Sequence, residues 1–355
     1  MSPNSEPAIV RYLLQHAWQS SSMRLTFAIA MIHNPLFLIG AERSGTTLMR
    51  LMLDSHPDVA FAEEFEYAVS QIADDGTFPE IQAYGEFLSL DRIFSTSGFK
   101  FDPSKSYPEL VNGFLEQRQQ AKGAEQVGAT VHFGFAKIPY VWPDARFIHM
   151  VRDPRDVARS CVGMGWAGNV WFGLDKWMEA DNEWGELQKH VDPDRVFTIK
   201  FSDLVGDHET VLKGLCEFIG VDYTDRMLTF ADETDYGVPN PERARSWRSD
   251  MSKLDVRLIE TRLGQRLAAR GYEPSGLAPV PNNRVVVEAL RAHSRIVRVI
   301  RRARFFGPRL VAQQLLARLT GDEERQREIR LRFNDIELTH IDKSWAENSD
   351  VRSSR

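Results

Sequence analysis

A short run of glycine, arginine and hydroxyl residues offers the clearest chemistry in this sequence. It directly follows an apolar segment, Leu36–Ile39, and its members are Gly40, Arg43, Ser44, Gly45, Thr46, Thr47 and Leu48. Glycines let the backbone approach an anion closely, and free amides at the start of a following helix favour negative charge. The threonine hydroxyls add further donors. The pattern therefore predicts an anion-binding loop at Gly40–Arg50.

The position of the cation in this loop indicates which anion is bound. Gly40 and Gly45 have the spacing of a nucleotide triphosphatase loop, in which a lysine follows the second glycine. Here Thr46 stands at that place, and the cation is Arg43, before the second glycine. A cation there can lie on the bridging oxygen of a phosphosulfate, where charge develops as the bond breaks. A generic glycine turn is the alternative.

A second group of anion-binding residue types follows the apolar segment Arg146–Val151. Proline at a helix start and aspartates in the first turn favour a helix from Pro154 onwards. Arg152 at the strand end and Ser160 on this helix could converge on one anion. We interpret three intervening charged residues as structural, namely Asp153, Arg155 and Asp156.

A third basic segment, Arg243–Asp250, contains a tryptophan among arginines. An exposed Trp247 could stack on an adenine ring, while Arg248 binds a phosphate. A core tryptophan surrounded by solvated arginines is the alternative.

Two residues near expected strand ends could remove a proton from an acceptor. Glu64 comes after the apolar run Val59–Phe61, and His132 follows Thr130 and Val131. Transfer to a hydroxyl needs such a base on the acceptor side. A surface carboxylate is the alternative for Glu64, with Glu63 as its neighbour, and a structural histidine is the alternative for His132.

Short apolar runs alternate with helical patterns and so predict an α/β protein. We expect helices on both faces of a mostly parallel central sheet, which makes a three-layer sandwich. Ligands of such sheets bind at the carboxyl ends of the strands, where the groups above are expected to lie. The strands are expected at Leu36–Ile39, Val59–Phe61, Gly128–Phe133, Arg146–Val151 and Arg195–Phe201.

The chain divides into three parts. We expect a lead-in at residues 1–34, a catalytic domain at 35–278 with an acceptor-side insertion at 66–125, and a helical extension with a frayed end at 279–355. Residues 284–310 hold eight arginines and one glutamate. This segment could contact an anionic membrane surface or a lipid phosphate. Packing on the domain or on a second subunit, in a homodimer, is the alternative.

Taken together, the motifs resemble the family of sulfotransferases that use 3′-phosphoadenosine-5′-phosphosulfate (PAPS). The loop, with Leu-Asp-Ser-His-Pro-Asp at 53–58, is most similar to the tyrosylprotein and bacterial carbohydrate branches, and the resemblance spans residues 36–275. It implies a P-loop-like sulfotransferase fold. It also implies transfer of a sulfuryl group to a hydroxyl of a carbohydrate, lipid or other small-molecule acceptor, with release of adenosine 3′,5′-bisphosphate (PAP).

The resemblance assigns roles to the candidate residues. The loop from Arg43 to Leu48 would hold the phosphosulfate, Arg152 and Ser160 the 3′-phosphate, and Trp247 and Arg248 would belong to a late cofactor loop. Glu64 matches the base of the tyrosylprotein and carbohydrate branches. His132 is similar to the base of cytosolic sulfotransferases.

One position departs from the family pattern. The family usually has a lysine on the strand before residue 133, where this chain has Ala129-Thr130-Val131. Either Arg43 carries the positive charge alone, or Lys137 or another residue reaches into the site.

Bulk properties limit the remaining function classes. A net charge of −6 argues against nucleic-acid binding over the whole surface. The two cysteines, Cys161 and Cys216, lack metal-ligand spacing, and no metal is expected. No apolar run reaches 18 residues and no signal-peptide pattern opens the chain, so we expect a cytoplasmic protein, with the inner membrane face as an alternative place. A P-loop kinase-like enzyme and a catalytically silent PAPS-binding module are the alternative functions.

Overall fold

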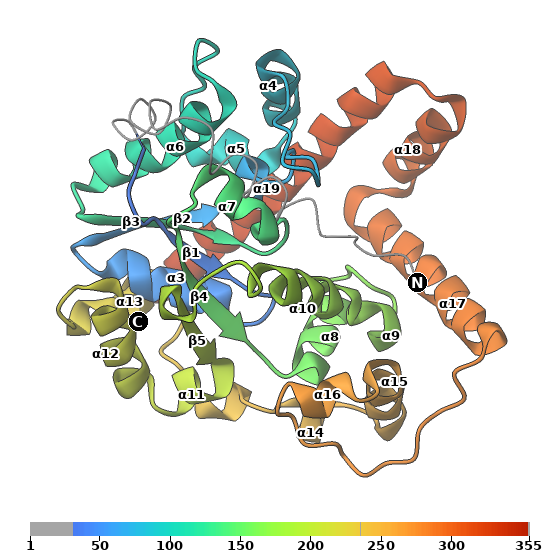
Figure 1. Cartoon of the computed structure of the whole chain (residues 1–355). Coiled ribbons are helices and arrows are strands. Elements are labelled where there is room, and N and C mark those ends of the chain that lie inside the picture. The colour runs from blue at the N-terminus through green and yellow to red at the C-terminus, as the bar shows by residue number, and fades with distance from the viewer. Residues whose placement is uncertain (1–30, 235, 354–355) are drawn as a thin grey trace, which may run out of the picture.

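Five parallel strands form the centre of the protein in the computed structural model, which describes residues 31–234 and 236–353. Their order across the sheet is β2-β3-β1-β4-β5 (Figure 1). The strands are β1 (Leu36–Ile39), β2 (Val59–Glu64), β3 (Gln126–Val131), β4 (Arg146–Val151) and β5 (Val196–Lys200). The prediction of a layered α/β fold with a parallel sheet is confirmed. β2 runs further than expected, so Glu64 is its last residue.

The central strand β1 is buried on both faces. It pairs with β3 on one side and β4 on the other, with Leu36 opposite Gly128 and Arg146. All four of its residues are fully buried. A strand covered on both faces has no position for a polar side chain, which explains the uninterrupted apolar run.

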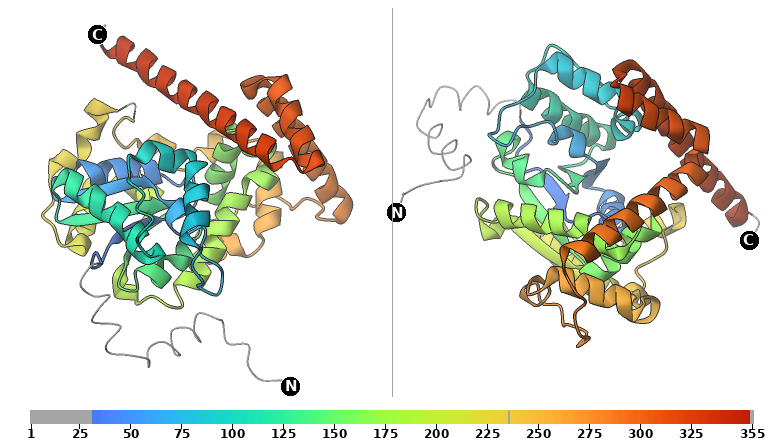
Figure 2. Two further views of the ribbon diagram at one scale, coloured as in Figure 1. Left: turned by 90° about the horizontal axis from the view of Figure 1, so that it is seen from above. Right: turned by 90° about the vertical axis from the view of Figure 1, so that its right-hand side faces the viewer.

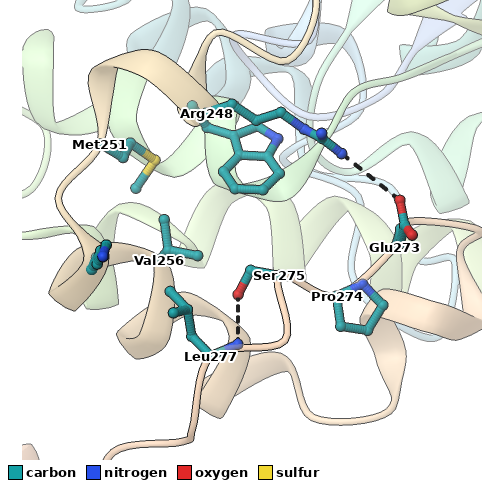
Figure 3. A pocket seen from close by; sticks show the side chains of 9 residues that line it. Arg248, Met251, Val256, Glu273, Pro274, Ser275 and Leu277 are labelled. Carbon is teal, nitrogen blue, oxygen red and sulfur yellow. Dashed lines mark hydrogen bonds and ion pairs between the residues drawn. The ribbon is translucent and has the colours of Figure 1, made fainter.

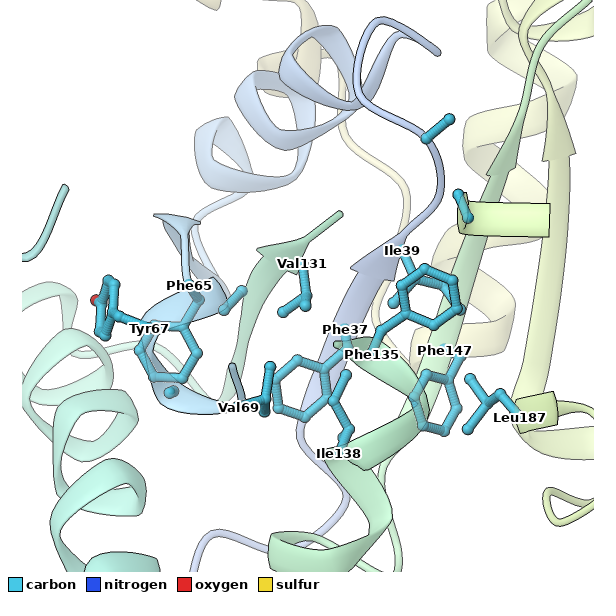
Figure 4. Packing of buried hydrophobic residues seen from close by; sticks show 14 of the residues in the cluster. Phe37, Ile39, Phe65, Tyr67, Val69, Val131, Phe135, Ile138, Phe147 and Leu187 are labelled. Atoms are coloured by element: carbon cyan, nitrogen blue, oxygen red, sulfur yellow. The ribbon is translucent and has the colours of Figure 1, made fainter. Parts of the chain in front are cut away.

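Alternate residues of β1 enter two separate cores. Phe37 and Ile39 pack with Phe65, Phe135 and Phe147 on one face, as Figure 4 shows. The helices of this face include α6 (Tyr107–Lys122), α8 (Pro154–Gly163), α10 (Asp175–Leu187) and α15 (Lys253–Leu263).

The opposite face carries the second core. Leu36 and Leu38 pack there with Met49 and Met52. The helices that cover this face include α3 (Thr46–Ser55), α11 (Phe201–Gly206) and α12 (His208–Ile219). Helices on both faces give the expected three layers.

The segment between β2 and β3 lies beyond the edge of the sheet and on one of its faces. It contains η1 (Glu66–Ala68), α4 (Ile81–Ser89), α5 (Arg92–Ser97) and α6. α6 packs on β2 and β3 and buries Val111, Phe114 and Leu115 there. Within the expected insertion at 66–125, α6 thus belongs to the helical layer, and the part before it projects outward.

Short helices make up most of the rest of the body, partly between the strands and partly after β5. They are η2 (Phe135–Lys137), α7 (Ile138–Val141), α9 (Val170–Gly173), η3 (Pro193–Arg195), η4 (Asp225–Leu228), α13 (Phe230–Glu233), η5 (Pro241–Arg243), α14 (Trp247–Asp250) and α16 (Arg266–Ala269). The lead-in expected at 1–34 lies outside the described residues except for its last four.

Three helices after residue 283 form a C-terminal unit along one side of the body (Figure 2). They are α17 (Arg284–Phe306), α18 (Pro308–Thr320) and α19 (Glu323–Ser353). The helical extension expected at 279–355 begins its first helix at Arg284 and is interrupted at Gly307, whose φ of 86° no regular right-handed helix allows. Ala317, Ile329 and Phe333 form a small core of their own. Among the described helices, none combines the length and the apolar character that a membrane span requires.

Two glycines of the body offer a matched test of this packing. A Cβ at Gly128 would lie 2.4 Å from the carbonyl oxygen of Leu36, whereas one at Gly185, within α10, would meet nothing within 4 Å. We expect Gly128→Ala to lower the free energy of unfolding by about 2 kcal/mol. Gly185→Ala should raise it by about 0.5 kcal/mol, because alanine favours a helix. Urea unfolding followed by circular dichroism measures both, and equal midpoints would contradict the close strand packing.

Candidate active site

The turn after β1 brings the backbone unusually close to β4. Gly40 has a φ of 142°, and a Cβ there would lie 2.3 Å from the carbonyl oxygen of Met150. Gly45, with a φ of 100°, has the ring of Phe201 where its Cβ would be. Both positions therefore require glycine. Between them the buried Ser44 donates from Oγ to the carbonyl of Ala41 at 2.6 Å and closes the turn.

Helix α3 begins at Thr46 with free amide groups. Gly45, at the N-cap position before the helix, has no side chain that could cap these amides, and the first turn of the helix contains no acidic residue. The first amides of a helix lack partners within the helix and carry a partial positive charge. Thr46 is buried, while Thr47 and Leu48 are half-buried on the same turn. This start of α3 has the properties that the sequence predicted for an anion site.

The structure brings Arg43, Arg152 and Ser160 together. The Nε of Arg43 donates to the Oγ of Ser160 on α8 at 2.9 Å. Arg152, the residue after β4, donates from Nη1 to the carbonyl oxygen of Arg43 at 3.1 Å. It donates from Nη2 to the carbonyl oxygen of Arg243 at 3.2 Å. The two expected anchors are therefore one continuous basic surface.

The guanidinium of Arg152 is incompletely paired. Its Nε is buried and has no hydrogen-bond partner among the described residues. Burial lowers the pKa of Arg152, and the nearby Arg43 and Arg243 lower it further against the opposing effect of Asp156. An anion bound here would satisfy the orphaned donor and offset the repulsion between the arginines.

His132 joins the loop to a carboxylate that the sequence analysis missed. Its Nε2 lies 2.9 Å from the Oγ1 of Thr46, and its Nδ1 lies 2.7 Å from the Oε1 of Glu66. The same oxygen of Glu66 accepts from the backbone amide of His132 at 2.9 Å. His132, Thr46 and Glu66 are all buried. Glu66 lies in η1, just after β2, and meets His132 because β2 and β3 are neighbours.

The charge of Glu66 controls the protonation of His132. Burial by itself lowers the pKa of His132, but the hydrogen bond and charge of Glu66 outweigh burial, with help from Glu64 and Glu42. The pKa of His132 is therefore raised above its ordinary value. A protonated ring donates from both nitrogens, so it would present its Nε2–H to Thr46.

Glu64 ends β2 at the edge of the sheet. It pairs with Thr130 after a register shift between Ala62 and Glu64, and it remains exposed. Partial desolvation, followed by the charge of Glu66, raises the pKa of Glu64. Its neighbour Glu63 instead forms an ion pair with Arg50 at 3.5 Å.

A cavity of about 250 Å³ adjoins Glu64 on the outer side of β2. Tyr67, Ile93 and Phe99 contribute apolar walls, and Arg50 lies on the side of α3. The segment before α6 thus forms one side of the cavity, and β2, α3 and α6 form the rest. The carboxyl group of Glu64 and a cavity lie next to each other here.

Lys137 does not take the place of the absent strand lysine. Its Nζ donates to the carbonyl oxygen of Ile72 at 2.6 Å and pairs with Asp74 at 2.9 Å. Lys176, at the start of α10, lies closer to the loop. Its Nζ pairs with Glu42 at 3.0 Å and lies over the ring of Phe133. No spacing in the sequence indicated Lys176, because its contact depends on how α10 packs.

The expectation of an exposed Trp247 is wrong. The residue is 7% exposed, and its ring centroid lies 3.7 Å from the guanidinium carbon of Arg155 and 5.3 Å from that of Arg248. Arg155 is itself buried and forms ion pairs with Asp153 and Glu260, and the ring of Trp247 packs against its guanidinium group. The ring of Trp247 is therefore part of the protein interior, as in the alternative of a core tryptophan given by the sequence analysis.

Trp247 and Arg248 nevertheless line a cavity of about 380 Å³, which Figure 3 shows. Arg248 is exposed and pairs loosely with Glu273 at 3.8 Å. Its guanidinium is therefore available to a ligand, unlike that of Arg155. Pro274 and Leu277 complete this cavity from the segment after α16.

Comparisons with known proteins agree with this arrangement. A model of the sulfotransferase family matches residues 35–225 of the chain. This segment contains the loop, Glu64, His132, Arg152 and Ser160. The chain belongs to the sulfotransferase family. The prediction of a PAPS-dependent sulfotransferase is confirmed at the level of the family.

Individual relatives are distant. Protein-tyrosine sulfotransferase 1 of Danio rerio is 24% identical over 281 residues, which cover 69% of this chain and 74% of the relative. The omega-hydroxy-beta-dihydromenaquinone-9 sulfotransferase of Mycobacterium bovis is 31% identical over 162 residues, covering 39% of this chain and 40% of the relative. The chain spans only about half the length of the Drosophila melanogaster protein-tyrosine sulfotransferase, namely 52%.

A solved structure is also similar to the chain. The sulfotransferase domain of the Synechococcus PCC 7002 olefin synthase superposes with a TM-score of 0.49 and 20% sequence identity. The superposition covers 68% of this chain and 97% of that domain.

The effect of the negative charge of Glu66 on the pKa of His132 can be tested without removing the hydrogen bonds that Glu66 accepts. In Glu66→Gln the amide oxygen still accepts from His132, but the burial of His132 is no longer opposed by a full negative charge. We expect the pKa of His132 to fall. A raised histidine pKa stabilises the fold fully below the unfolded value of about 6.5, and this contribution disappears as pH rises through the folded pKa.

The loss of stability in Glu66→Gln should therefore be largest at acidic pH and shrink as pH rises. Thermal unfolding of both proteins between about pH 5.5 and 9 measures this difference. Glu63→Gln, an exposed carboxylate beside Arg50, is the matched control and should show little pH dependence. A pH-independent loss in Glu66→Gln would mean that His132 is neutral.

Proposed function

We propose that this protein transfers a sulfuryl group from PAPS to a hydroxyl and releases PAP. One observation supports this most strongly. The anion-binding start of α3 and the Arg152–Ser160 pair come from different parts of the chain, yet Arg43 links them through two hydrogen bonds. PAPS has two anionic groups of the kind that such a double site binds, a 5′-phosphosulfate and a 3′-phosphate.

Each cofactor contact follows from a donor already described. The amides from Gly45 to Thr47 and the hydroxyls of the two threonines bind the phosphosulfate, while the amide of Ser44 donates to the carbonyl oxygen of Ala41 within the turn. Arg152, whose Nε lacks a partner among the described residues, binds the 3′-phosphate together with Ser160. Arg248 covers this end of the cofactor from the cavity beside Trp247.

The acceptor reacts on the side of Glu64. The hydroxyl oxygen of the acceptor forms a bond with sulfur while the bond between sulfur and the bridging oxygen breaks. Glu64 takes the proton of the hydroxyl, and the electron pair of the broken bond stays on the phosphate of PAP. Arg43 and the loop amides stabilise the charge that develops there.

His132 supplies the positive charge for which the family usually uses a lysine. Both of its ring nitrogens are engaged within the protein, so it is poorly placed to take a proton from an acceptor. As an imidazolium held by Glu66, it donates to Thr46, whose hydroxyl hydrogen is then free to point at the phosphosulfate. The runner-up assignment, His132 as a second base beside Glu64, requires its Nε2 to leave Thr46.

The acceptor is a hydroxyl compound that reaches the 250 Å³ cavity. By their names, the relatives from Danio rerio and Mycobacterium bovis act on protein tyrosine and on an omega-hydroxylated menaquinone. Both acceptors present a hydroxyl. We propose a small-molecule, glycan or lipid hydroxyl for this chain.

Cofactor binding tests the first half of the proposal. We expect calorimetry to show micromolar or tighter binding of PAP, and Arg152→Ala to weaken it at least tenfold through loss of a charge-assisted contact. Arg195→Ala is the control and should bind normally, because Arg195 ends η3 just before β5, at the end of the strand opposite to the site. Preference for ATP over PAP would favour the kinase-like alternative instead.

Transfer of ³⁵S from labelled PAPS to a panel of hydroxyl compounds tests the second half. Glu64→Gln should lower kcat at least 100-fold, whereas Glu63→Gln should not. In the wild type kcat should fall as pH drops through the raised pKa of Glu64, because a protonated carboxyl cannot accept the proton. Tight PAP binding with no transfer to any compound would support the silent binding module.

A further inference from the structure

One face of α17 is tightly fixed to the body of the protein. The Cα of Gly168 lies so close to Ser294 that a Cβ would be 2.5 Å from the carbonyl oxygen of Ser294. Arg301 donates to the carbonyl oxygen of Val162, and Asn169 donates to that of Leu290 at 2.8 Å. The side of the helix that faces the body is therefore the side of Ser294 and Arg301.

The opposite face of α17 is apolar and uncovered. Val285, Ile296, Val299 and Ile300 lie about 140° to 240° around the helix from Ser294, at about 100° per residue. They are 78%, 59%, 46% and 45% exposed. α18 adds three further exposed leucines, Leu315, Leu316 and Leu319. Large exposed apolar side chains gathered on one unit mark an interaction surface.

Arginines border this apolar face. Arg295, about 100° from Ser294, is exposed on one flank, and Arg304, about 280° from Ser294, is exposed on the other. Arg298 is also exposed, between the flank of Arg295 and the body. Glu288 is the only acidic residue between 284 and 310, where eight arginines occur, although the whole chain has a net charge of −6. The positive charge is therefore concentrated around the apolar face.

The combination of an exposed apolar face with arginines beside it favours one kind of binding partner over others. A second copy of the chain docking by a two-fold axis would bring arginines against arginines. A nucleic acid would match the charge but would leave the aliphatic side chains without an apolar surface. An amphipathic helix with arginines beside an apolar face fits the boundary between anionic headgroups and acyl chains. We propose that α17 and α18 dock the protein on an anionic membrane surface.

The docking surface is rigidly connected to the candidate active site. The loop between Val162 and Gly168, held by α17, carries Trp166, whose ring lies 6.0 Å from the guanidinium carbon of Arg43. On the acceptor side, Glu337 of α19 pairs with Arg92 of α5 at 3.1 Å. Docking therefore sets the orientation of the site relative to the membrane. This inference does not depend on the proposed reaction.

Co-sedimentation with vesicles tests the inference. The wild type should bind vesicles of phosphatidylglycerol and phosphatidylcholine, and bind pure phosphatidylcholine at least tenfold more weakly. Ile296→Asp with Val299→Asp should lower the partition coefficient at least tenfold. Arg295→Gln with Arg298→Gln should lower it about 25-fold at low salt, at roughly fivefold per arginine, and less at high salt.

Leu254→Asp, at an exposed leucine of α15, is the matched control and should bind like the wild type. Circular dichroism and PAP binding show whether each variant is folded. Equal partition of the wild type and the Ile296 and Val299 variant would overturn the inference, as would equal binding to both vesicle types. The inference would also be overturned if the wild type formed a dimer that did not bind vesicles and the Ile296 and Val299 variant were a monomer. Failure of the wild type to bind PAP would instead contradict the proposed function.

Discussion

The close approach of Gly40 to the carbonyl of Met150 is the contact on which the site depends. It lets the chain turn sharply at the end of β1 and start α3 between the ends of β3 and β4. The same turn directs the carbonyl of Arg43 towards Arg152, so the two basic groups share one surface. Any side chain at position 40 would push the loop away from β4 and separate them.

The positively charged side chains around this turn differ in how their charge is paired within the protein. Burial lowers the pKa of Arg152, and Arg43 and Arg243, which lie near it, lower it further, while Asp156 opposes them. His132 is different, because its charge is matched by Glu66 in the absence of ligand. When His132 is protonated, its charge is therefore paired within the protein, whereas Arg43 and Arg152 have no such dedicated carboxylate in the hydrogen bonds described above.

Much of this could be predicted from the sequence, because the relevant signals are local. The runs Leu36–Ile39 and Arg146–Val151 are strands with the predicted bounds, since strands buried on both faces are apolar throughout. The loop and the Arg152 segment were recognisable because an anion site at a helix start is made by consecutive residues.

Contacts between distant segments were not predictable in the same way. Glu66 meets His132 only because β2 is the neighbour of β3, an order that no local pattern encodes. Lys176, and not Lys137, lies near the loop because of how α10 packs. Trp247 was expected to be exposed because its neighbours in the sequence are arginines. Its ring instead packs against the buried Arg155, which is distant in the sequence.

The place of Glu64 on the edge strand β2 has an evolutionary consequence. The loop at Gly40–Arg50 follows the central strand β1, which is paired on both sides, so a change there would disturb β3 and β4 as well. Among the described strands β2 pairs with β3 alone, and the cavity beside Glu64 lies at this edge of the sheet. Insertions and substitutions there can reshape the cavity while the loop after β1 keeps its geometry. If the proposed function holds, evolution can change the acceptor in this way without weakening the binding of the cofactor.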